Sequence, residues 1–285
     1  MIKIFEINSS LRVSENNKYE LTKDIEDANF LFFTYKIRSK QDKINYIGEN
    51  SIPIVSDAIR LSRKYKKKLV YLCGGDRPPV ILPNIENILV LNTSVSRSKK
   101  ASNEMVIGVS LPDKFKYYLL NPKLSIGFVG QKLHNREKYL HYLSNSGITT
   151  DFILRDAYIH KLKNRHILDF ENNMNSNLFT FCYRGAGNFS VRFYETLMRG
   201  RIPIVIKTDN IFPFEEWINY NRVGLFIEET DLNENMNLEE QINNFYYSRS
   251  KEELIDMQKY NRQIYLTYFK ESVFFEKIFE YIERY

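Results

Sequence analysis

Residues 178–206 read LFTFCYRGAGNFSVRFYETLMRGRIPIVI, and this stretch determines how the second half of the chain folds. The apolar runs 178–183 and 202–206 predict two buried strands. Between them, residues 184–189 form a loop with two glycines, and residues 191–199 have the apolar spacing of a helix. Buried strands joined by a helix are typical of a parallel sheet with helices on both faces. The stretch therefore predicts an α/β fold.

The loop in this stretch is a candidate anion site. A right-handed crossover places it at the carboxyl end of the sheet, where open α/β folds bind ligands. Gly185 and Gly187 allow the backbone to approach a phosphate closely, and the first N–H groups of the helix favour a negative charge. Arg184 and Arg192 lie at the same helix end, where a cation costs about 0.3–1 kcal/mol unless an anion is nearby. We therefore expect a diphosphate there.

The helix after the loop carries one carboxylate, Glu195, three residues after Arg192 and on the same face. This carboxylate can accept hydrogen bonds from both hydroxyls of a ribose, or it can pair with Arg192 or Arg199 on a solvated face. Ser190 or Asn188 is the expected N-cap of the helix. Because the loop lacks the third glycine of a dinucleotide-binding fingerprint, its pattern alone does not decide between these interpretations.

Similar patterns recur along the whole chain. Further apolar runs of strand length lie at 2–7, 30–35, 68–73, 88–93, 124–130, 151–155 and 223–227. Helical stretches at 52–66 and 135–146 separate some of these runs, and the series begins again after the irregular stretch 110–123. We therefore expect two Rossmann-like domains, residues 1–121 and 122–285, with a boundary near residue 121.

The segments after the quoted stretch border the same end of the predicted sheet. Residues 209–217 follow its last strand, and there Trp217 and Phe214 either wall a sugar or base, or fill the core. Residues 228–231 follow the next strand and are interpreted as a solvated acidic turn. The last stretch, 263–285, has helical apolar spacing, and we interpret it as a core helix that packs back on the first domain; a membrane-surface helix is the alternative.

The composition limits the class of protein. Of 285 residues, 43% are apolar and 27% charged, which is typical of a globular protein. The net charge of +6 suits an anionic ligand, such as a nucleotide diphosphate, an acidic glycan or an anionic membrane. The lysines are spread along the chain, which argues against nucleic acid as a partner. Cys73 and Cys182 are interpreted as buried reduced thiols, and no Cys/His cluster has the spacing of a metal site.

Four short motifs follow one another in the second half of the chain. They are Arg184-Gly185, Ser190-x-Arg192-Phe193-x-Glu195-x-Leu197, Gly200-x-Ile202-Pro203-Ile204-Val205 and Pro213-Phe214-x-Glu216-x-Ile218. In order and spacing they resemble the exostosin-like glycosyltransferase family. The resemblance implies an α/β, GT-B-like fold, in which the parallel sheets of two Rossmann-like domains face each other across a cleft. It also implies inverting transfer of a sugar from a UDP-sugar bound by the second domain to an acceptor on the side of the first.

The resemblance assigns roles to residues of these motifs and of the glycine loop. The expected donor-binding set is Arg184, Gly185, Gly187, Ser190, Arg192, Glu195 and Glu216. In this set the two arginines hold the diphosphate, the serine donates to it, Glu195 binds the ribose, and Glu216 contacts the donor sugar or braces the loop. Fixed positive groups can stabilise the departing diphosphate, so we expect no metal ion and no cofactor besides the UDP-sugar substrate.

An inverting transfer also needs a general base for the acceptor hydroxyl. Asp76 follows the predicted strand 68–73 and is the first candidate, although an Asp before Pro78 can also serve only to form a turn. His134, which follows the strand 124–130, is the second candidate.

The expected acceptor is a glycan or lipid-linked glycan, in the synthesis of a surface or capsular polysaccharide. The sequence is shorter than most members of the family and lacks their N-terminal membrane anchor, so we expect a cytoplasmic protein, with peripheral association at the inner face of the membrane left open. Two alternatives remain. One is a fucosyltransferase-like GT-B enzyme that uses a GDP-sugar, and the other is a non-catalytic subunit that binds a nucleotide-sugar or a glycan.

Overall fold

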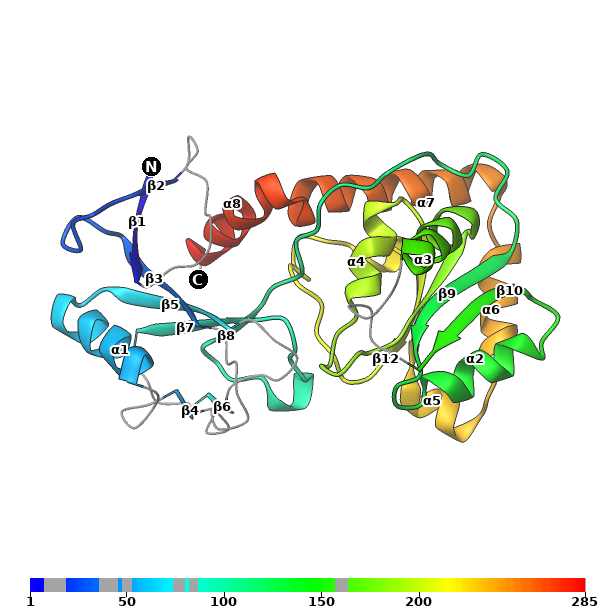
Figure 1. The fold of residues 1–285 in the computed structure, drawn as a ribbon, viewed down its shortest axis with the longest axis horizontal. Helices are drawn as coiled ribbons and strands as arrows, with labels where there is room; N and C mark the ends of the chain where they lie inside the picture. Colours follow the sequence, from blue (N-terminus) through cyan, green and yellow to red (C-terminus); the bar gives the residue numbers. More distant parts are fainter. Residues whose placement is uncertain are drawn as a thin grey trace.

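Two parallel sheets form two α/β domains in the computed structural model (Figure 1). The structure describes residues 1–7, 19–35, 46–47, 53–73, 80–81, 87–156 and 164–284. Within these ranges the first sheet has six strands and the second has five, and neighbouring strands run parallel in both. The predicted fold class, two Rossmann-like domains in a GT-B-like arrangement, is therefore confirmed.

The first sheet has the strand order β2-β1-β3-β5-β7-β8. Its strands are β1 (Ile2–Ile7), β2 (Tyr19–Leu21), β3 (Phe30–Tyr35), β5 (Lys68–Cys73), β7 (Ile88–Asn92) and β8 (Glu104–Val106). Helix α1 (Pro53–Tyr65) covers one face, and a short 3-10 helix, η1 (Arg97–Lys99), lies between β7 and β8. A separate parallel pair is formed by two short strands of two residues each, β4 (Tyr46–Ile47) and β6 (Val80–Ile81).

The second sheet has the order β10-β9-β11-β12-β13. Its strands are β9 (Ser125–Gln131), β10 (Thr149–Arg155), β11 (Phe179–Cys182), β12 (Ile202–Lys207) and β13 (Leu225–Glu228). The helices that follow or separate them are α2 (Arg136–Ser144), α3 (Asn164–Ser176), α4 (Val191–Met198), η3 (Tyr220–Arg222), α5 (Glu229–Glu234), α6 (Leu238–Tyr247), α7 (Lys251–Ile264), the π-helical turn η4 (Tyr265–Phe269) and α8 (Glu271–Ile282). Each apolar run that the sequence analysis interpreted as a strand is a strand in one of the two sheets.

In both sheets the strand order reverses at the corresponding place, beside the strand that comes first in the sequence of that domain. The reversal lies between β1 and β3 in the first sheet and between β9 and β11 in the second. Loops leave such a point in opposite directions, which opens a crevice at the carboxyl ends of the strands. The glycine loop that follows β11 lies at this point of the second sheet.

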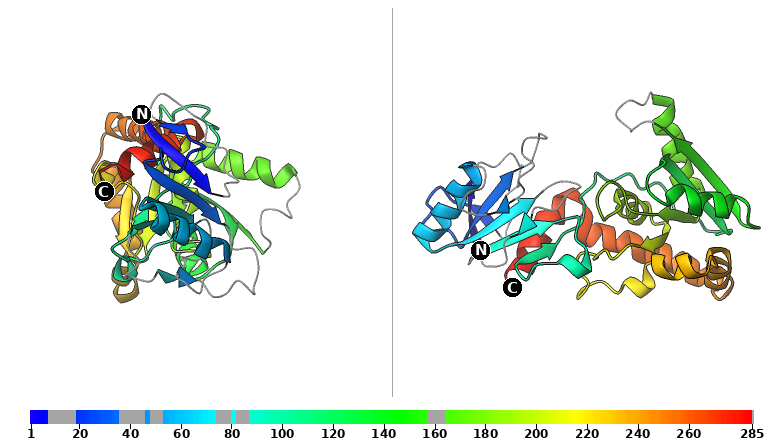
Figure 2. Two further views of the ribbon diagram at one scale, coloured as in Figure 1. Left: turned by 90° about the vertical axis from the view of Figure 1, so that its left-hand side faces the viewer. Right: turned by 90° about the horizontal axis from the view of Figure 1, so that it is seen from below.

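The far end of the chain completes the first domain. The ring of Phe279 in α8 lies 4.9 Å from that of Tyr19, and 5.6 Å from the rings of both Phe30 and Phe32, measured between centroids. Figure 2 shows α8 beside the first sheet, at the end of a helical path from the second domain. The core around Phe279 is continuous with residues of α4, such as Phe193, so that one hydrophobic core spans both domains.

The segment between the two sheets, residues 107–124, is fixed to the C-terminal helices. Arg262 of α7 donates to both carboxylate oxygens of Asp113, at 2.8 and 2.5 Å, and its guanidinium holds the pKa of that carboxyl below its usual value. The hydroxyl of Tyr265 donates to the carbonyl oxygen of Leu111 at 2.7 Å. The predicted domain boundary at residue 121 falls in this segment.

No helix within the described ranges has the length and apolarity that crossing a membrane requires.

Phe214 and Trp217 belong to the core rather than to a ligand-binding wall. Phe214 is 1% exposed, and its ring stacks on that of Trp217 at 5.8 Å. Tyr281 of α8 contacts the other side of this pair, 4.9 Å from Trp217. The sequence left both interpretations open, and these contacts favour the core.

Candidate functional site

The candidate site lies at the carboxyl end of the second sheet, where β9 and β11 end side by side. His134, in the loop after β9, places Nε2 3.1 Å from the carbonyl oxygen of Gly185. Arg136 donates to the carbonyl oxygens of Gln131, at the end of β9, and of Arg184, after β11, at 2.6 and 2.7 Å. Burial lowers the pKa of this guanidinium to about 10. It remains charged at neutral pH and holds the two strand ends together.

The glycine loop is closed by its own backbone. Gly185 donates its N–H to the carbonyl oxygen of Phe189 at 2.9 Å, and Asn188 donates its N–H to Ser94 Oγ of the first domain at 2.7 Å. Gly185 therefore contributes the shape of the loop rather than an amide for a ligand. Ser190 occupies the predicted N-cap position of α4 in an extended conformation, but its hydroxyl makes no capping hydrogen bond. That hydroxyl and the first N–H groups of α4 are the donors that a ligand can use.

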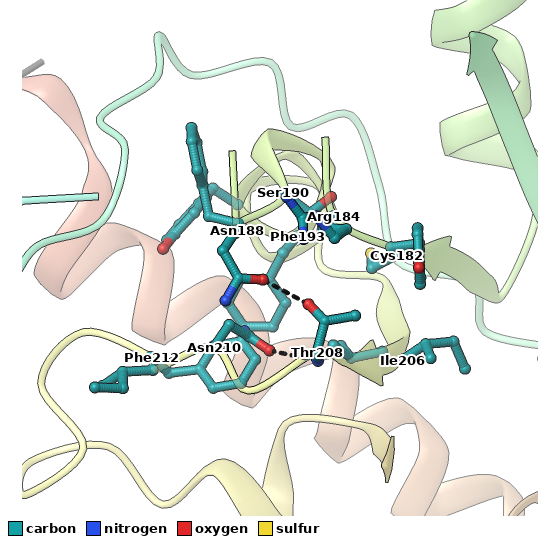
Figure 3. Close-up of a pocket in the computed structure, with 14 residues that line it drawn as sticks. Cys182, Arg184, Asn188, Ser190, Phe193, Ile206, Thr208, Asn210 and Phe212 are labelled. Carbon is teal, nitrogen blue, oxygen red and sulfur yellow. Dashed lines mark hydrogen bonds between the residues drawn. The ribbon is translucent and has the colours of Figure 1, made fainter. Parts of the chain in front are cut away.

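Arg184 and Ser190 line a narrow cavity between the loop and the segment after β12 (Figure 3). The cavity has a volume of about 20 Å³, enough for one water molecule. Arg184 is half-buried, and its Nη2 makes a long contact of 3.5 Å with the carbonyl oxygen of Ala186. A diphosphate is much larger than this cavity, so the cavity cannot enclose one in the present arrangement of the loops.

Asn188 connects the loop to both of its neighbours. Its Oδ1 accepts a hydrogen bond from Thr208 Oγ1 at 2.6 Å, and its Nδ2 donates to Ser96 Oγ at 2.9 Å (the first of these bonds is drawn in Figure 3). With the bond from its N–H to Ser94, this one residue joins the glycine loop, the end of β12 and the first domain. The residue was expected only as a possible helix cap, so its position between the domains is a finding of the structure.

A second set of bonds crosses between the domains close by. Arg97 donates to the carboxylate of Glu215 at 2.8 Å, and Glu215 also accepts from the N–H of Phe212 at 3.1 Å. Ser98 donates its hydroxyl to Asp209. Glu215 thus braces the segment after β12. In the sequence analysis, this role was one of two expected for its neighbour Glu216, which is exposed. We refer to the contacts of Ser94–Ser98 with Asn188, Asp209 and Glu215 as the interdomain clasp.

Arg192 and Glu195 occupy a different face of α4, next to α3 and the end of β9. Arg192 lies over the ring of Phe128 at 4.3 Å and donates to the carbonyl oxygen of Val129. A Cβ atom at Gly130 would lie 3.0 Å from Arg192 Nη2, so glycine at this position leaves room for the guanidinium. Neither Arg192 nor Glu195 is among the residues that line the cavity beside the loop.

Glu195 is partly buried and lies near three cationic groups. Burial raises the pKa of its carboxyl, and the nearby charges of Arg192, Arg199 and Lys114 oppose that rise. Arg199 also lies 3.7 Å from Glu171 of α3. The pairing of Glu195 with Arg192 or Arg199 that was considered from the sequence therefore fits the structure, but it lies on a partly buried face rather than a solvated one.

The acidic turn after β13 contains a residue that the sequence did not single out. Glu229 accepts hydrogen bonds from Asn135 Nδ2, Tyr139 Oη and Tyr183 Oη, at 3.0, 3.0 and 2.7 Å. Its neighbour Glu228 is exposed and pairs with the ammonium of Lys207. The interpretation of this segment as a solvated turn therefore holds for Glu228 and is wrong for Glu229.

The two candidates for a general base have different outcomes. Asp76 lies outside the described residues. His134 is exposed beside the loop, and its backbone has a φ of +52°, in the left-handed region that non-glycine residues seldom adopt.

Within the described ranges, no three His, Cys, Asp or Glu side chains are grouped closely enough to hold a metal ion. Cys73 and Cys182 are buried and free, as predicted.

Taken together, these features define a class: a doubly wound α/β protein of two domains, with a candidate ligand-binding edge on the second sheet. Comparison with known proteins narrows this class. Residues 151–242 match the Exostosin GT47 domain. The chain is exostosin-like over this segment, as its motifs predicted.

Curated relatives match about a quarter of the chain. Over 78 residues, or 27% of this chain, it is 28% identical to the probable glucuronosyltransferase 47 A of Physcomitrium patens and 27% identical to the probable beta-1,4-xylosyltransferase IRX10L of Arabidopsis thaliana. The matches span 17% and 19% of the lengths of these two relatives.

Solved structures resemble the fold at low identity. The pneumococcal O-GlcNAc transferase GtfA, in complex with UDP and GlcNAc, is 11% identical with a TM-score of 0.46, and the match covers 89% of this chain and 56% of that one. An alpha1,3-fucosyltransferase is 13% identical with a TM-score of 0.42, over 99% of this chain and 89% of that one.

Proposed function

We propose that the chain is a glycosyltransferase that moves a sugar from a UDP-sugar to a hydroxyl of a glycan or lipid-linked glycan, with inversion at the sugar carbon. The observation that supports this most is the position of Arg184. Its half-buried guanidinium lies at the carboxyl end of β11, within the exostosin-like segment, and the one hydrogen bond that it makes with the described residues is long. A guanidinium that is poorly bonded by the protein at such a strand end is suited to an anionic ligand.

The reaction needs positive groups where the diphosphate departs. As the acceptor oxygen bonds to the sugar carbon, the bond from that carbon to the diphosphate breaks and negative charge grows on the leaving oxygen. Arg184, the hydroxyl of Ser190 and the first N–H groups of α4 are fixed donors that would stabilise this charge. Arg136 and Arg192 lie behind them, both over the ring of Phe128, and add positive potential from within the protein.

The acceptor hydroxyl must lose its proton during the transfer, and we propose His134 or Asp76 as the base. His134 is exposed next to the glycine loop, and when its Nε2 carries the proton bonded to the Gly185 carbonyl, Nδ1 is free to accept another. We further propose that the reaction needs no divalent metal, because the arginines and the helix end supply the positive charge. Loss of transfer in the presence of a chelator, and its return with added Mg²⁺ or Mn²⁺, would contradict this.

Thermal unfolding with UDP and with GDP tests the donor assignment. We expect UDP to raise the unfolding temperature, since a ligand at about 100 times its Kd adds about 2.7 kcal/mol to stability. Arg184→Ala should remove most of this stabilisation and lower the transfer rate about 100-fold or more. Arg222→Ala is the matched control. Arg222 precedes β13 and so lies at the amino end of the same sheet, whereas Arg184 follows β11 at the carboxyl end.

Three outcomes would change the proposal. Stabilisation by GDP alone would replace UDP by GDP as the nucleotide. Tight binding of UDP, with neither transfer to any acceptor nor hydrolysis of the donor, would favour a non-catalytic binding subunit. Equal binding of UDP by the wild type and by Arg184→Ala would show that the donor site lies elsewhere.

A further inference from the structure

Glu229 is the point where three segments meet at the carboxyl end of the second sheet. Three side chains donate to one of its oxygens, Oε1: Asn135 Nδ2 at 3.0 Å, Tyr139 Oη at 3.0 Å and Tyr183 Oη at 2.7 Å. Asn135 follows β9, Tyr139 lies in α2, and Tyr183 follows β11 (Figure 1). One carboxylate oxygen therefore joins segments that the chain reaches at widely separated positions.

The two tyrosines depend on this oxygen as an acceptor. Tyr139 and Tyr183 are buried, and their ring centroids lie 5.7 Å apart. Burial, and next the hydrogen bond to Glu229, raises the pKa of both phenols above the ordinary value of 10.0, so both hydroxyls stay protonated. A buried hydroxyl that loses its acceptor costs free energy, so both rings would have to move if the oxygen were withdrawn.

Two of the three donors are chain neighbours of residues in the proposed site. Asn135 directly follows His134, and Tyr183 directly precedes Arg184. Consecutive Cα atoms are separated by a fixed distance of about 3.8 Å, so a residue that is anchored limits where its neighbour can lie. Glu229 thus anchors both the loop that carries the candidate base and the strand end that carries the candidate diphosphate ligand.

The backbone of His134 needs such an anchor. Its φ of +52° is seldom adopted by residues other than glycine, and such a conformation persists only where the surroundings fix it. Asn135 occupies the N-cap position of α2 but makes no capping hydrogen bond, because its side-chain amide donates to Glu229 instead. Arg136 donates to the carbonyl oxygen of Arg184 at 2.7 Å. The two residues after His134 are therefore both held by their side chains.

The charge of Glu229 does not by itself explain its position. Burial raises the pKa of its carboxyl, but the hydrogen bonds from its three donors and the charge of Arg184 outweigh burial and hold that pKa below its usual value. Within the described part of the chain, no ion pair joins Glu229 to Arg184. A negative charge near this guanidinium opposes the binding of an anion. What Glu229 supplies to an anion site is therefore the place of an acceptor oxygen.

We propose that Glu229 is a positioning residue of the candidate site: its Oε1 holds Asn135 and Tyr183, and through them it fixes the backbone of His134 and Arg184. This inference rests on the proposed function, which gives the two neighbours their roles as a candidate base and as a ligand of the diphosphate. Glu229 itself touches no substrate in this role.

Two substitutions separate the place of the oxygen from the charge. Glu229→Gln keeps an oxygen at the position of Oε1 and removes the charge, and within the described part of the chain no hydrogen bond to Oε2 is lost. Glu229→Asp keeps the charge but retracts the oxygen by one methylene group. Calorimetry with UDP should show that Glu229→Gln binds at least as tightly as the wild type. Glu229→Asp should bind about 10-fold or more weakly, because small misplacements of a binding group have large effects.

The matched control for these variants is Glu228→Gln, at the exposed neighbouring carboxylate, and it should bind UDP as the wild type does. Thermal unfolding of each variant checks that it is folded.

Amide hydrogen exchange of Gly185 tests the same role without a nucleotide. Its N–H bonds to the carbonyl oxygen of Phe189 at 2.9 Å, so its exchange reports local opening of the glycine loop. Exchange should be about 10-fold or more faster in Glu229→Asp and unchanged in Glu229→Gln. Ile148→Val is the control for lower stability, because this buried residue directly precedes β10, at the amino end of the sheet. It should leave exchange of Gly185 unchanged.

The outcomes distinguish the two proposals. If the wild type binds neither UDP nor GDP, the proposed function fails, while exchange of Gly185 still tests whether Glu229 holds the loop; if GDP is the ligand, calorimetry is done with GDP. The role of Glu229 is overturned if Glu229→Asp keeps the wild-type exchange rate or the wild-type affinity. It is also overturned if Glu229→Gln weakens binding as much as Glu229→Asp, because the charge would then be what acts on the ligand.

Discussion

The two domains have sheets of the same type and the same strand order near the reversal point, but they are closed by different parts of the chain. The second sheet is covered by helices from its own half, with α2, α5 and α6 on one face and α4 on the other. In the first sheet, α1 covers one face and α8, from the far end of the chain, covers the other. The sheet that carries the candidate site is thus covered by helices from its own half of the chain, while the first sheet depends on the last helix of the other half.

The strongest test of this difference is to remove the ring that joins α8 to the first sheet. Phe279→Ala should lower the free energy of unfolding by about 3–5 kcal/mol, because a 1% exposed ring is replaced by a cavity. Denaturant unfolding followed by fluorescence measures this loss. Tyr247→Ala, at a ring that is 74% exposed, is the control and should change stability by about 0.5 kcal/mol or less. Equal effects of the two changes would show that α8 does not hold the first domain.

A smaller effect is expected at the clasp, where the two domains meet beside the glycine loop. Asn188→Ala removes bonds to Ser96 and Thr208 and should cost about 1–3 kcal/mol, because partly buried partners lose a donor or an acceptor. Hydrogen exchange should become faster in residues 94–98, since their contacts across the interface weaken. Asn221→Ala, at an exposed position, is the control. Unchanged exchange in residues 94–98 would show that Asn188 does not couple the domains.

The smallest effect concerns how the free energy of unfolding of the second domain changes at acid pH. The native pKa of Glu229 is lowered, so this group adds stability above its unfolded pKa and loses it as the pH falls through its native pKa. Tyr183→Phe removes one of its donors and should cost about 0.5–1.5 kcal/mol at neutral pH. It should also raise the pKa of Glu229 toward the ordinary value of 4.5, so that this contribution is lost at a higher pH. Titration of the carboxyl carbon by NMR measures the shift, and a fall in that pKa would contradict the assignment.

The parts of the fold that the sequence predicted are those with continuous apolar runs. All nine of the strands expected from such runs are present, since a strand buried on both faces carries its signal in every residue. Strand β8 was missed because it has three residues and includes Glu104, whose carboxylate is buried and accepts a hydrogen bond from Asn92 Nδ2 at 2.9 Å. A buried charge whose partner lies in the preceding strand, 12 residues earlier, has no signal within its own strand.

Helix α3 was missed for a related reason. Its sequence, NRHILDFENNMNS, is rich in asparagine, a weak helix former. In the structure, Asn173 donates to the carbonyl oxygen of Asp151 at 2.6 Å, and Asn175 to that of Glu171 at 2.6 Å. The bond of Asn175 lies within the helix, whereas that of Asn173 reaches the backbone of β10, which no pattern within the helix can reveal.

The candidate site was predicted in part. Arg184 and Ser190 were expected to act together because they lie in two adjacent short motifs, and the structure brings both to the same cavity. Glu229 was not found, because its three donors come from positions 46 to 94 residues earlier in the chain. The interdomain clasp was missed for the same reason, as Asn188 meets Ser94 and Ser96 only after both domains have folded.

The dependence of the first sheet on α8 has a consequence for how the protein is made. A ribosome releases the strands β1 to β8 long before residues 271–282, so the face that carries Phe30 and Phe32 waits for its cover through most of translation. An open apolar sheet face on a nascent chain is prone to aggregation and is a target for chaperones. Because α8 is synthesised last, the first sheet can be completed only after the whole of the second domain has been made.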